Sequence, residues 1–233
     1  MNARLRPRQS RGHFDHGWLD TYHTFSFGEY FDPQWQQFRT LRVMNEDVVA
    51  AGQGFGMHGH NDMEILTWVL SGELEHRDSL GHGAKLRPGE MQWMSAGSGI
   101  RHSEFNPSES EPTHLYQIWL FPDRKGYTPA YDQREFPQEG RRNRFQVLAA
   151  ADGRDGALPI RQDAVVMAAE LESGSGLQQV LSEHRHAWLQ VLRGNVQANG
   201  QPLVAGDGVG IGGLSELSVT ATSAAEVLLF DLA

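Results

Sequence analysis

From residue 40 onward the chain is a succession of short β-like runs separated by Gly, Asp, Asn or Pro. Regularly spaced short strands with turns between them are typical of a β-sandwich or β-barrel. No stretch of helix length shows a 3.6-residue period, apart from a turn or two near residues 128–136. We therefore expect an all-β fold. The expected strands are residues 40–45, 65–70, 74–77, 91–94, 114–121, 145–149, 164–171, 177–181, 187–192, 196–198 and 227–232.

The two halves of the chain are weak copies of each other. Residues 68–74 (WVLSGEL) lead through a turn to a Gly-acid bend at residues 86–90. Residues 190–196 (QVLRGNV) lead in the same way to a Gly-acid bend at residues 203–207. The recurring order of strand, Gly, strand, turn and bend indicates the internal duplication of one β-barrel.

A polar stretch with Pro and Gly, at about residues 122–143, separates the two halves. We expect an N-terminal domain over residues 1–140 and a C-terminal domain over residues 141–233. Residues 1–38 are irregular and rich in aromatic side chains, and we expect them to form an arm packed on the outside of the first barrel.

Composition excludes several classes of protein. Cysteine is absent, so disulfides, iron–sulfur clusters and zinc–thiolate sites are excluded, and any metal must be held by nitrogen and oxygen ligands. A formal net charge of −9 is repelled by a phosphate backbone, so we expect no nucleic-acid partner. No apolar run approaches the roughly 20 residues that span a bilayer, and the basic start has no apolar segment behind it. We expect a cytoplasmic protein with no membrane partner.

Two pairs of metal-ligand side chains stand at i, i+2 spacing in the N-terminal half. His58 and His60 follow a Gly-rich run, and His102 and Glu104 follow a second Gly-rich turn. Since residues i and i+2 of a strand point to the same face, each pair would offer two donors to one ion. Together they supply three imidazoles and one carboxylate, without sulfur.

Each pair has a simpler explanation that the sequence leaves open. A lone His-x-His is weak evidence in a chain with 11 histidines, and His58 and His60 taken alone could belong to a solvent-facing strand. His102 and Glu104 taken alone could be an ordinary hydrogen-bonded surface pair. His184 and His186 have the same spacing but no later partner, so we expect a surface or packing role for them. Glu64 has the parity to join the first pair, and a pocket carboxylate and a purely structural one fit it equally well.

The two segments resemble the paired cupin motifs, Gly-x5-His-x-His-x3-4-Glu-x6-Gly and Gly-x5-Pro-x-Gly-x2-His-x3-Asn. There are three departures: seven residues separate Glu64 from Gly72, Ser95 stands in place of Pro, and two extra residues precede His102. These details resemble the pirin branch of the cupin superfamily, and within it the bacterial pirin-like proteins described as quercetin 2,3-dioxygenases. The stretches that carry the resemblance are residues 12–20, 23–27, 52–66, 94–106 and 114–119.

The resemblance implies a bicupin, with two tandem antiparallel β-barrels of the jelly-roll type, in which only the N-terminal barrel carries metal. Its ligands would be His58, His60, His102 and Glu104. Fe(II) is the expected ion, with Zn, Ni, Mn and Cu as alternatives, because nitrogen and oxygen donors select little among them. The activity implied is that of an oxidoreductase, a dioxygenase that opens a flavonol such as quercetin at the 2,3-position with O2. Glu104 would accept the proton of the substrate 3-hydroxyl.

Some expectations concern the surroundings of the metal. We expect Glu64, Trp93, Met94 and Gln117 to line the substrate pocket, and the protein to be a monomer. Two other functions stay open. One is a pirin-type regulator that binds a protein partner and uses the metal as a redox sensor. The other is a cupin that binds a small acid, with no metal or with a purely structural one.

Overall fold

The computed structural model describes residues 2–233, which divide into two compact units. The first, called the N-terminal unit, comprises residues 12–135 and 160–162. The second, called the C-terminal unit, takes in the beginning of the described chain as well as its end. The expected domain boundary after residue 140 stays a prediction. The segments of the C-terminal unit are residues 2–11, 136–159 and 163–233.

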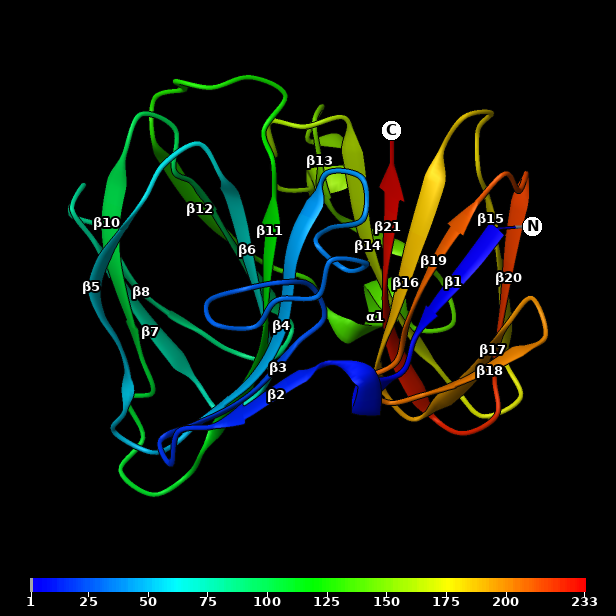
Figure 1. The fold of residues 1–233 in the computed structure, drawn as a ribbon, viewed down its shortest axis with the longest axis horizontal. Coiled ribbons are helices and arrows are strands. Elements are labelled where there is room, and N and C mark those ends of the chain that lie inside the picture. The colour runs from blue at the N-terminus through cyan, green and yellow to red at the C-terminus, as the bar shows by residue number, and fades with distance from the viewer. Residues whose placement is uncertain (1) are drawn as a thin grey trace. The chain divides into compact units, whose positions relative to one another are not determined.

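Two antiparallel sheets form the N-terminal unit (Figure 1). In chain order their strands are β2 (Gly12–Asp15), β3 (Leu19–His23), β4 (Leu41–Val49), β5 (Gly54–His60), β6 (Glu64–Ser71), β7 (Leu74–Asp78), β8 (Gly83–Leu86), β9 (Glu90–Ser95), β10 (Ile100–Phe105), β11 (Thr113–Leu120) and β12 (Ala130–Glu135). The larger sheet has the order β12-β9-β6-β11-β4-β3-β2, and the smaller has the order β5-β10-β7-β8. Val69 and Leu115 of the larger sheet are buried together with Leu74 and Leu86 of the smaller, so this core lies between the sheets.

The C-terminal unit repeats this arrangement. Its strands are β1 (Asn2–Arg6), β13 (Gln146–Ala150), β14 (Ala164–Leu171), β15 (Gly176–Val180), β16 (His186–Arg193), β17 (Asn195–Ala198), β18 (Gln201–Val204), β19 (Gly208–Gly212), β20 (Glu216–Ala221) and β21 (Ala225–Leu232). The order β19-β16-β21-β14 repeats β9-β6-β11-β4, and β15-β20-β17-β18 repeats β5-β10-β7-β8. Leu189 and Leu229 of the larger sheet share a buried core with Val196 and Val219 of the smaller.

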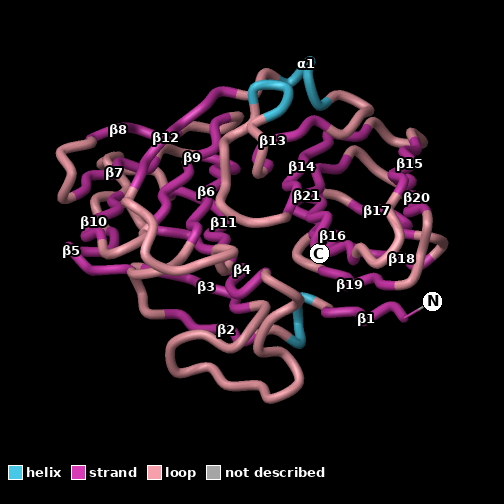
Figure 2. Tube along the Cα trace, turned by 90° about the horizontal axis from the view of Figure 1, so that it is seen from above, coloured by secondary structure: helices cyan, strands magenta, loops and turns pink. Residues whose placement is uncertain are grey.

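The predicted all-β bicupin fold is confirmed, with one refinement. Each unit is a jelly-roll sandwich of two sheets rather than a closed barrel, because the hydrogen-bonded ladders end at separate edges of each sheet. Strands dominate both units (Figure 2). The helical segments of the described residues are α1 (Gln138–Arg141) and single 3-10 turns at Arg8–Ser10 and Arg154–Gly156. None of the helices within residues 2–233 has the length and apolar character needed to cross a membrane.

Residues 2–23 differ from the expected irregular arm, whereas residues 24–38 form no strand beyond isolated bridges. β1 pairs with β19 in the C-terminal unit, while β2 and β3 extend the larger sheet of the N-terminal unit beyond β4. In β3, Leu19, Thr21 and His23 are buried and the residues between them are half-buried, which is the period of a strand with one face on the core. The many aromatic residues around this short alternation hid it. β2 and β3 are therefore part of the N-terminal sandwich, and β3 supplies one wall of the site described below.

The segment near residues 128–136 also differs from expectation. Instead of a helical turn it contains β12, which pairs with β9 so that Ala130 lies opposite Ser95 and Glu135 opposite Glu90. The Tyr131 hydroxyl donates to Gln92 across this pair. Pairing with an existing sheet edge satisfies the backbone of a segment that shows no helical period, and this tertiary gain decides its conformation.

Candidate metal centre

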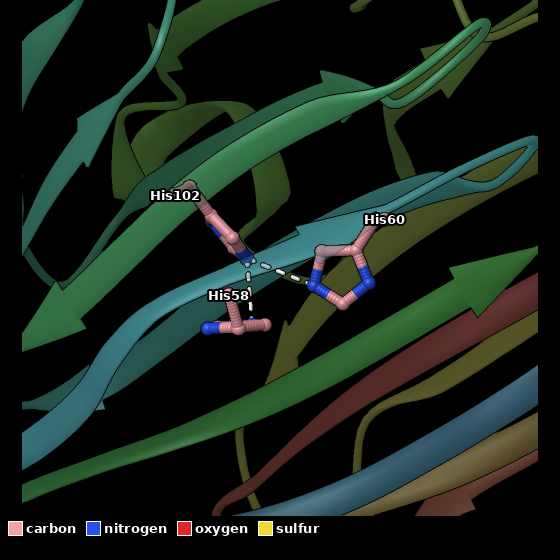
Figure 3. A group of neighbouring side chains, drawn as sticks. All are labelled: His58, His60 and His102. Carbon is pink, nitrogen blue, oxygen red and sulfur yellow. Dashed lines mark hydrogen bonds between the residues drawn. The ribbon is translucent and has the colours of Figure 1, made fainter.

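β5 and β10 carry all four expected ligands, and the three histidines among them converge. The two strands pair antiparallel, with His58 directly opposite His102. His58 and His60, two residues apart on β5, turn their rings toward the ring that comes from β10 (Figure 3). A side chain on Gly54 would prevent this approach, because a Cβ at that position would lie 2.2 Å from the backbone oxygen of Glu104. The glycine near the start of β5 is thus needed for the two strands to meet.

The three imidazoles converge through their Nε2 atoms. His60 Nε2 lies 3.0 Å from His102 Nε2, and His58 Nε2 lies 3.1 Å from the same atom (Figure 3). Two donors that are each about 2.1 Å from one ion lie about 3.0 Å apart when they meet it at a right angle, and about 3.4 Å apart at a tetrahedral angle. The observed spacing therefore fits neighbouring corners of an octahedron.

The electrostatic surroundings keep two of these rings, those of His60 and His102, in the neutral form that binds metal. Burial lowers the pKa of His102 to about 3, and His58 and His76 add to this effect. Burial likewise lowers the pKa of His60 to about 4, with repulsion from the other two rings contributing. The His58 Nδ1 donates to the carbonyl of Gly56 at 2.7 Å, which leaves its Nε2 with the lone pair. Neutral imidazoles with a free Nε2 lone pair are the ligands that divalent ions require.

Glu104 stands next to this cluster with one oxygen unsatisfied. Its Oε2 accepts a hydrogen bond from Gln117 Nε2 at 3.0 Å, whereas its Oε1 is buried with no hydrogen-bond partner in residues 2–233. A carboxylate oxygen of Glu104 and one ring nitrogen each of His102 and His76 lie within 4.8 Å of one another. Glu104 is not within the same distance of all three converging histidines. An orphaned buried carboxylate oxygen is costly, and a cation beside it would remove that cost. The donor set thus fits a divalent metal ion.

The three histidines and Glu104 line one side of a cavity of about 320 Å³. This volume is within the range of small-molecule sites. Its walls are mainly apolar, and β3, β4 and β11 each add polar side chains to them. Asp47 accepts a 2.5 Å hydrogen bond from Thr21 Oγ1, and Asn45 has a buried Oδ1 without a hydrogen-bond partner in the described chain. The other lining residues are Leu19, His23, Phe27, Phe55, Ile65, Gln117 and Trp119.

Of the expected pocket residues, Gln117 lines this cavity, and Glu64, Trp93 and Met94 do not. The Glu64 carboxylate is buried elsewhere, where it accepts hydrogen bonds from Trp93 Nε1 at 2.7 Å and from Ser95 Oγ at 2.5 Å. Successive residues of a strand point to opposite faces, and Ile65, the next residue of β6, is the one that lines the cavity. Met94 packs in an apolar core cluster with Ile65. The arrangement of Glu64 is that of a structural carboxylate.

Several residues that line the cavity were not predicted from the sequence. Thr21 and His23 of β3 and Asn45 and Asp47 of β4 face the cavity at two-residue spacing. The alternation within each strand is visible in the sequence. The pairing of β3 with β4, which brings the two pairs to one wall of the cavity, is not, because it joins residues more than 20 positions apart.

The C-terminal unit offers no counterpart of this cluster in its corresponding strands. β15 and β20 correspond to β5 and β10 by sheet order, and neither contains a histidine. His184 lies in the loop before β16 with a side chain 89% exposed, and His186 begins β16.

We expect His184→Ala and His186→Ala, singly or together, to leave the metal content per chain unchanged after loading with Ni(II) and desalting. The physical reason is that neither side chain belongs to a group of His, Asp and Glu residues that could hold a metal ion, among the described residues. Plasma mass spectrometry of the desalted protein measures this directly, and a loss of about half the metal would reveal a second site.

Comparison with known proteins gives a consistent picture. The family model described as Pirin matches residues 4–120, and the one described as Quercetinase C-terminal cupin domain matches residues 147–232. The chain is 49% identical to the quercetin 2,3-dioxygenase of Escherichia coli K12, over 98% of this chain and 97% of that one. It is 42% identical to a pirin-like protein of Caulobacter vibrioides, over 98% of each chain. A crystal structure of an Escherichia coli bacterial pirin in complex with nickel(II) superposes with a TM-score of 0.95 at 47% identity, covering 99% of each chain.

Proposed function

The chain belongs to the pirin family, and on this premise we propose that it is a metal-dependent dioxygenase that opens flavonols such as quercetin at the 2,3-position with O2. The observation that carries the proposal is the convergence of three Nε2 atoms beside a buried carboxylate oxygen that lacks a partner. A relative at 49% identity is named for this reaction. The cavity adjoining the cluster has walls suited to a flat aromatic molecule.

We propose His58, His60, His102 and Glu104 as the residues that hold one divalent ion. The structure of the Escherichia coli pirin is a complex with nickel(II), which supports a divalent metal in this chain. Among divalent ions we propose Fe(II), because histidines with a carboxylate and open positions are the donor set of non-haem iron oxygenases. When bound, the ion would supply a Lewis acid that lowers the pKa of a substrate hydroxyl and would mediate the reaction with O2.

The chain's own side chains would bind, orient and deprotonate the substrate. Phe27, Phe55 and Trp119 supply aromatic surface in the cavity that packs against flat rings and excludes water. Asn45 Oδ1, buried without a partner in the described residues, is placed to accept a hydrogen bond from a phenolic hydroxyl. Glu104 would also accept the proton of the flavonol 3-hydroxyl, and Gln117, which donates to Oε2, holds that carboxylate in place.

The experiment that tests this function starts from metal-free protein. The protein is loaded anaerobically with Fe(II), and in parallel with Ni(II), and then receives quercetin and O2. We expect loss of the flavonol absorbance and release of carbon monoxide, at rates well above those of an equally treated His58→Ala/His60→Ala variant. Cleavage no faster than in that variant would refute the enzyme proposal. A fully metal-loaded protein without turnover would instead favour the regulator whose metal senses redox state.

A further inference from the structure

A buried chain of side chains leads from His102 away from the substrate cavity. His102 Nδ1 lies 3.4 Å from His76 Nδ1, and His76 Nε2 lies 3.3 Å from Asp78 Oδ2. The same Asp78 oxygen lies 2.9 Å from Nδ1 of His82. The side chains of His76 and Asp78 are 0% exposed, whereas that of His82 is 43% exposed. The chain therefore connects the metal cluster with the surface of the smaller sheet.

We propose that Asp78 and His76 are positioning residues that fix the tautomer of His102 and strengthen it as a metal ligand. The inference rests on the metal site proposed above and adds two residues that do not themselves hold the ion.

The direction of each hydrogen bond follows from the acceptors at the far end. Asp78 Oδ1 accepts from the backbone N–H of Leu80 at 2.9 Å and of His82 at 3.1 Å, and Oδ2 accepts from His82 Nδ1. Burial raises the pKa of Asp78, but the hydrogen bonds from His82, His76 and Leu80 together hold it below its usual value. An ionised carboxylate can only accept, so the proton between it and His76 belongs to His76 Nε2.

The remaining links follow from the chemistry of neutral imidazole, in which one nitrogen donates and the other accepts. If His76 Nε2 carries the proton, its Nδ1 is the acceptor and can take a hydrogen bond from His102 Nδ1–H. The proton on His102 Nδ1 leaves its Nε2 with the lone pair, and this is the atom that meets His58 and His60. Asp78 thus determines, through His76, which nitrogen of His102 faces the metal.

The surrounding structure holds this chain in one arrangement. His76 and Asp78 lie at i, i+2 on β7, so both point inward, and His102 pairs with Asp78 in the neighbouring strand. The Tyr131 ring stacks on His76, with centroids 4.7 Å apart, and on His82 at 5.1 Å. Stacking on both rings restricts their rotation. A metal-bound histidine whose other nitrogen donates toward a carboxylate is a better oriented and more basic ligand, and loss of such support typically lowers metal affinity about 10–100-fold.

Asp78→Asn tests the inference with little change of shape. The amide oxygen can still accept from the backbone N–H groups of Leu80 and His82, so the β7–β8 turn keeps its hydrogen bonds. The amide NH2 would now donate to His76 Nε2, which forces the proton onto His76 Nδ1 and sets it against the His102 Nδ1–H. We expect Ni(II) affinity, measured by chelator competition, to fall about 10–100-fold. We also expect the midpoint potential of the iron-loaded form to rise, because Fe(III) depends more on a strong donor.

Three further variants separate positioning from packing and from charge. Glu75→Gln removes the same charge from β7 at a residue whose side chain points to the other face and pairs with Arg77, and it should leave affinity and potential unchanged. His76→Gln can still accept from His102 and donate to Asp78, so its affinity should stay within about fivefold of wild type. His76→Leu removes the acceptor and keeps the Asp78 turn, so it should reproduce the loss even if Asp78→Asn does not fold.

The outcomes distinguish this inference from the site on which it rests. If Asp78→Asn and His76→Leu bind Ni(II) within twofold of wild type while His58→Ala/His60→Ala does not bind it, the metal site stands and the positioning role is overturned. If His58→Ala/His60→Ala retains full Ni(II), the proposed site itself fails. Equal losses in Glu75→Gln and Asp78→Asn would also overturn the positioning role, because net charge alone would then explain them.

Discussion

The double substitution His58→Ala/His60→Ala is expected to abolish metal binding while leaving the protein folded. It removes two of the three Nε2 atoms that converge at 3.0–3.1 Å, so the loss should exceed the roughly 10–100-fold that removal of a supporting partner costs. Both side chains are only partly buried and lie on β5, an edge strand of the smaller sheet, so the apolar core is untouched. Plasma mass spectrometry after loading and desalting measures the metal, and circular dichroism verifies the fold.

The same variant has a second expected signature in its metal-free form. Burial lowers the pKa of His60 from 6.5 to about 4 and that of His102 to about 3. As the pH falls from about 6.5 toward 4, the unfolded chain takes up protons on these rings that the folded protein does not, so the wild type loses stability in this window. The variant lacks His60 and the repulsion that His58 exerts on His102. Its urea midpoint should therefore fall less between pH 7 and pH 4.5, and an equal fall in both proteins would contradict this reasoning.

Glu104→Gln is expected to separate stability from function. The variant keeps the size of the side chain and an oxygen to accept from Gln117, but replaces the unpartnered buried carboxylate oxygen with a neutral group. Because a buried polar group without a partner costs about 1–3 kcal/mol, and more when it is charged, the metal-free variant should be as stable as wild type or about 1 kcal/mol more stable. Differential scanning calorimetry of both metal-free proteins measures the difference.

Function should change in the opposite direction. Loss of the anionic donor should weaken metal binding, and loss of the proton acceptor should lower kcat for quercetin about 10²–10⁴-fold at saturating metal, the usual contribution of a positioned base. Thr67→Val is the control, because it removes a different contact of Gln117, the hydrogen bond from Thr67 Oγ1 to Gln117 Oε1. Gln117→Glu is unsuitable, since it would place a second carboxylate against that of Glu104. A Glu104→Gln protein that is strongly destabilised but fully active would show that the carboxylate is structural.

The local periods of the chain predicted much of the site. His58 with His60, and His102 with Glu104, could be paired from sequence because alternation along a strand is a property of the backbone and needs no partner. The duplicated strand order was readable for the same reason, since strand, turn and Gly-acid bend recur within each half. In both cases the information lies within a few residues along the chain.

The remaining features depend on which strand lies beside which. Three features follow from pairings between distant segments. They are the burial of the Glu64 carboxylate away from the cavity, the cavity wall supplied by Thr21 and His23, and the contact of His76 with His102. A shift of one residue in any of these registers would exchange the inward and outward side chains. The sequence by itself therefore determined the strands and the donors each one carries, and the tertiary structure decided which donors meet, because register is set by packing across the whole sandwich.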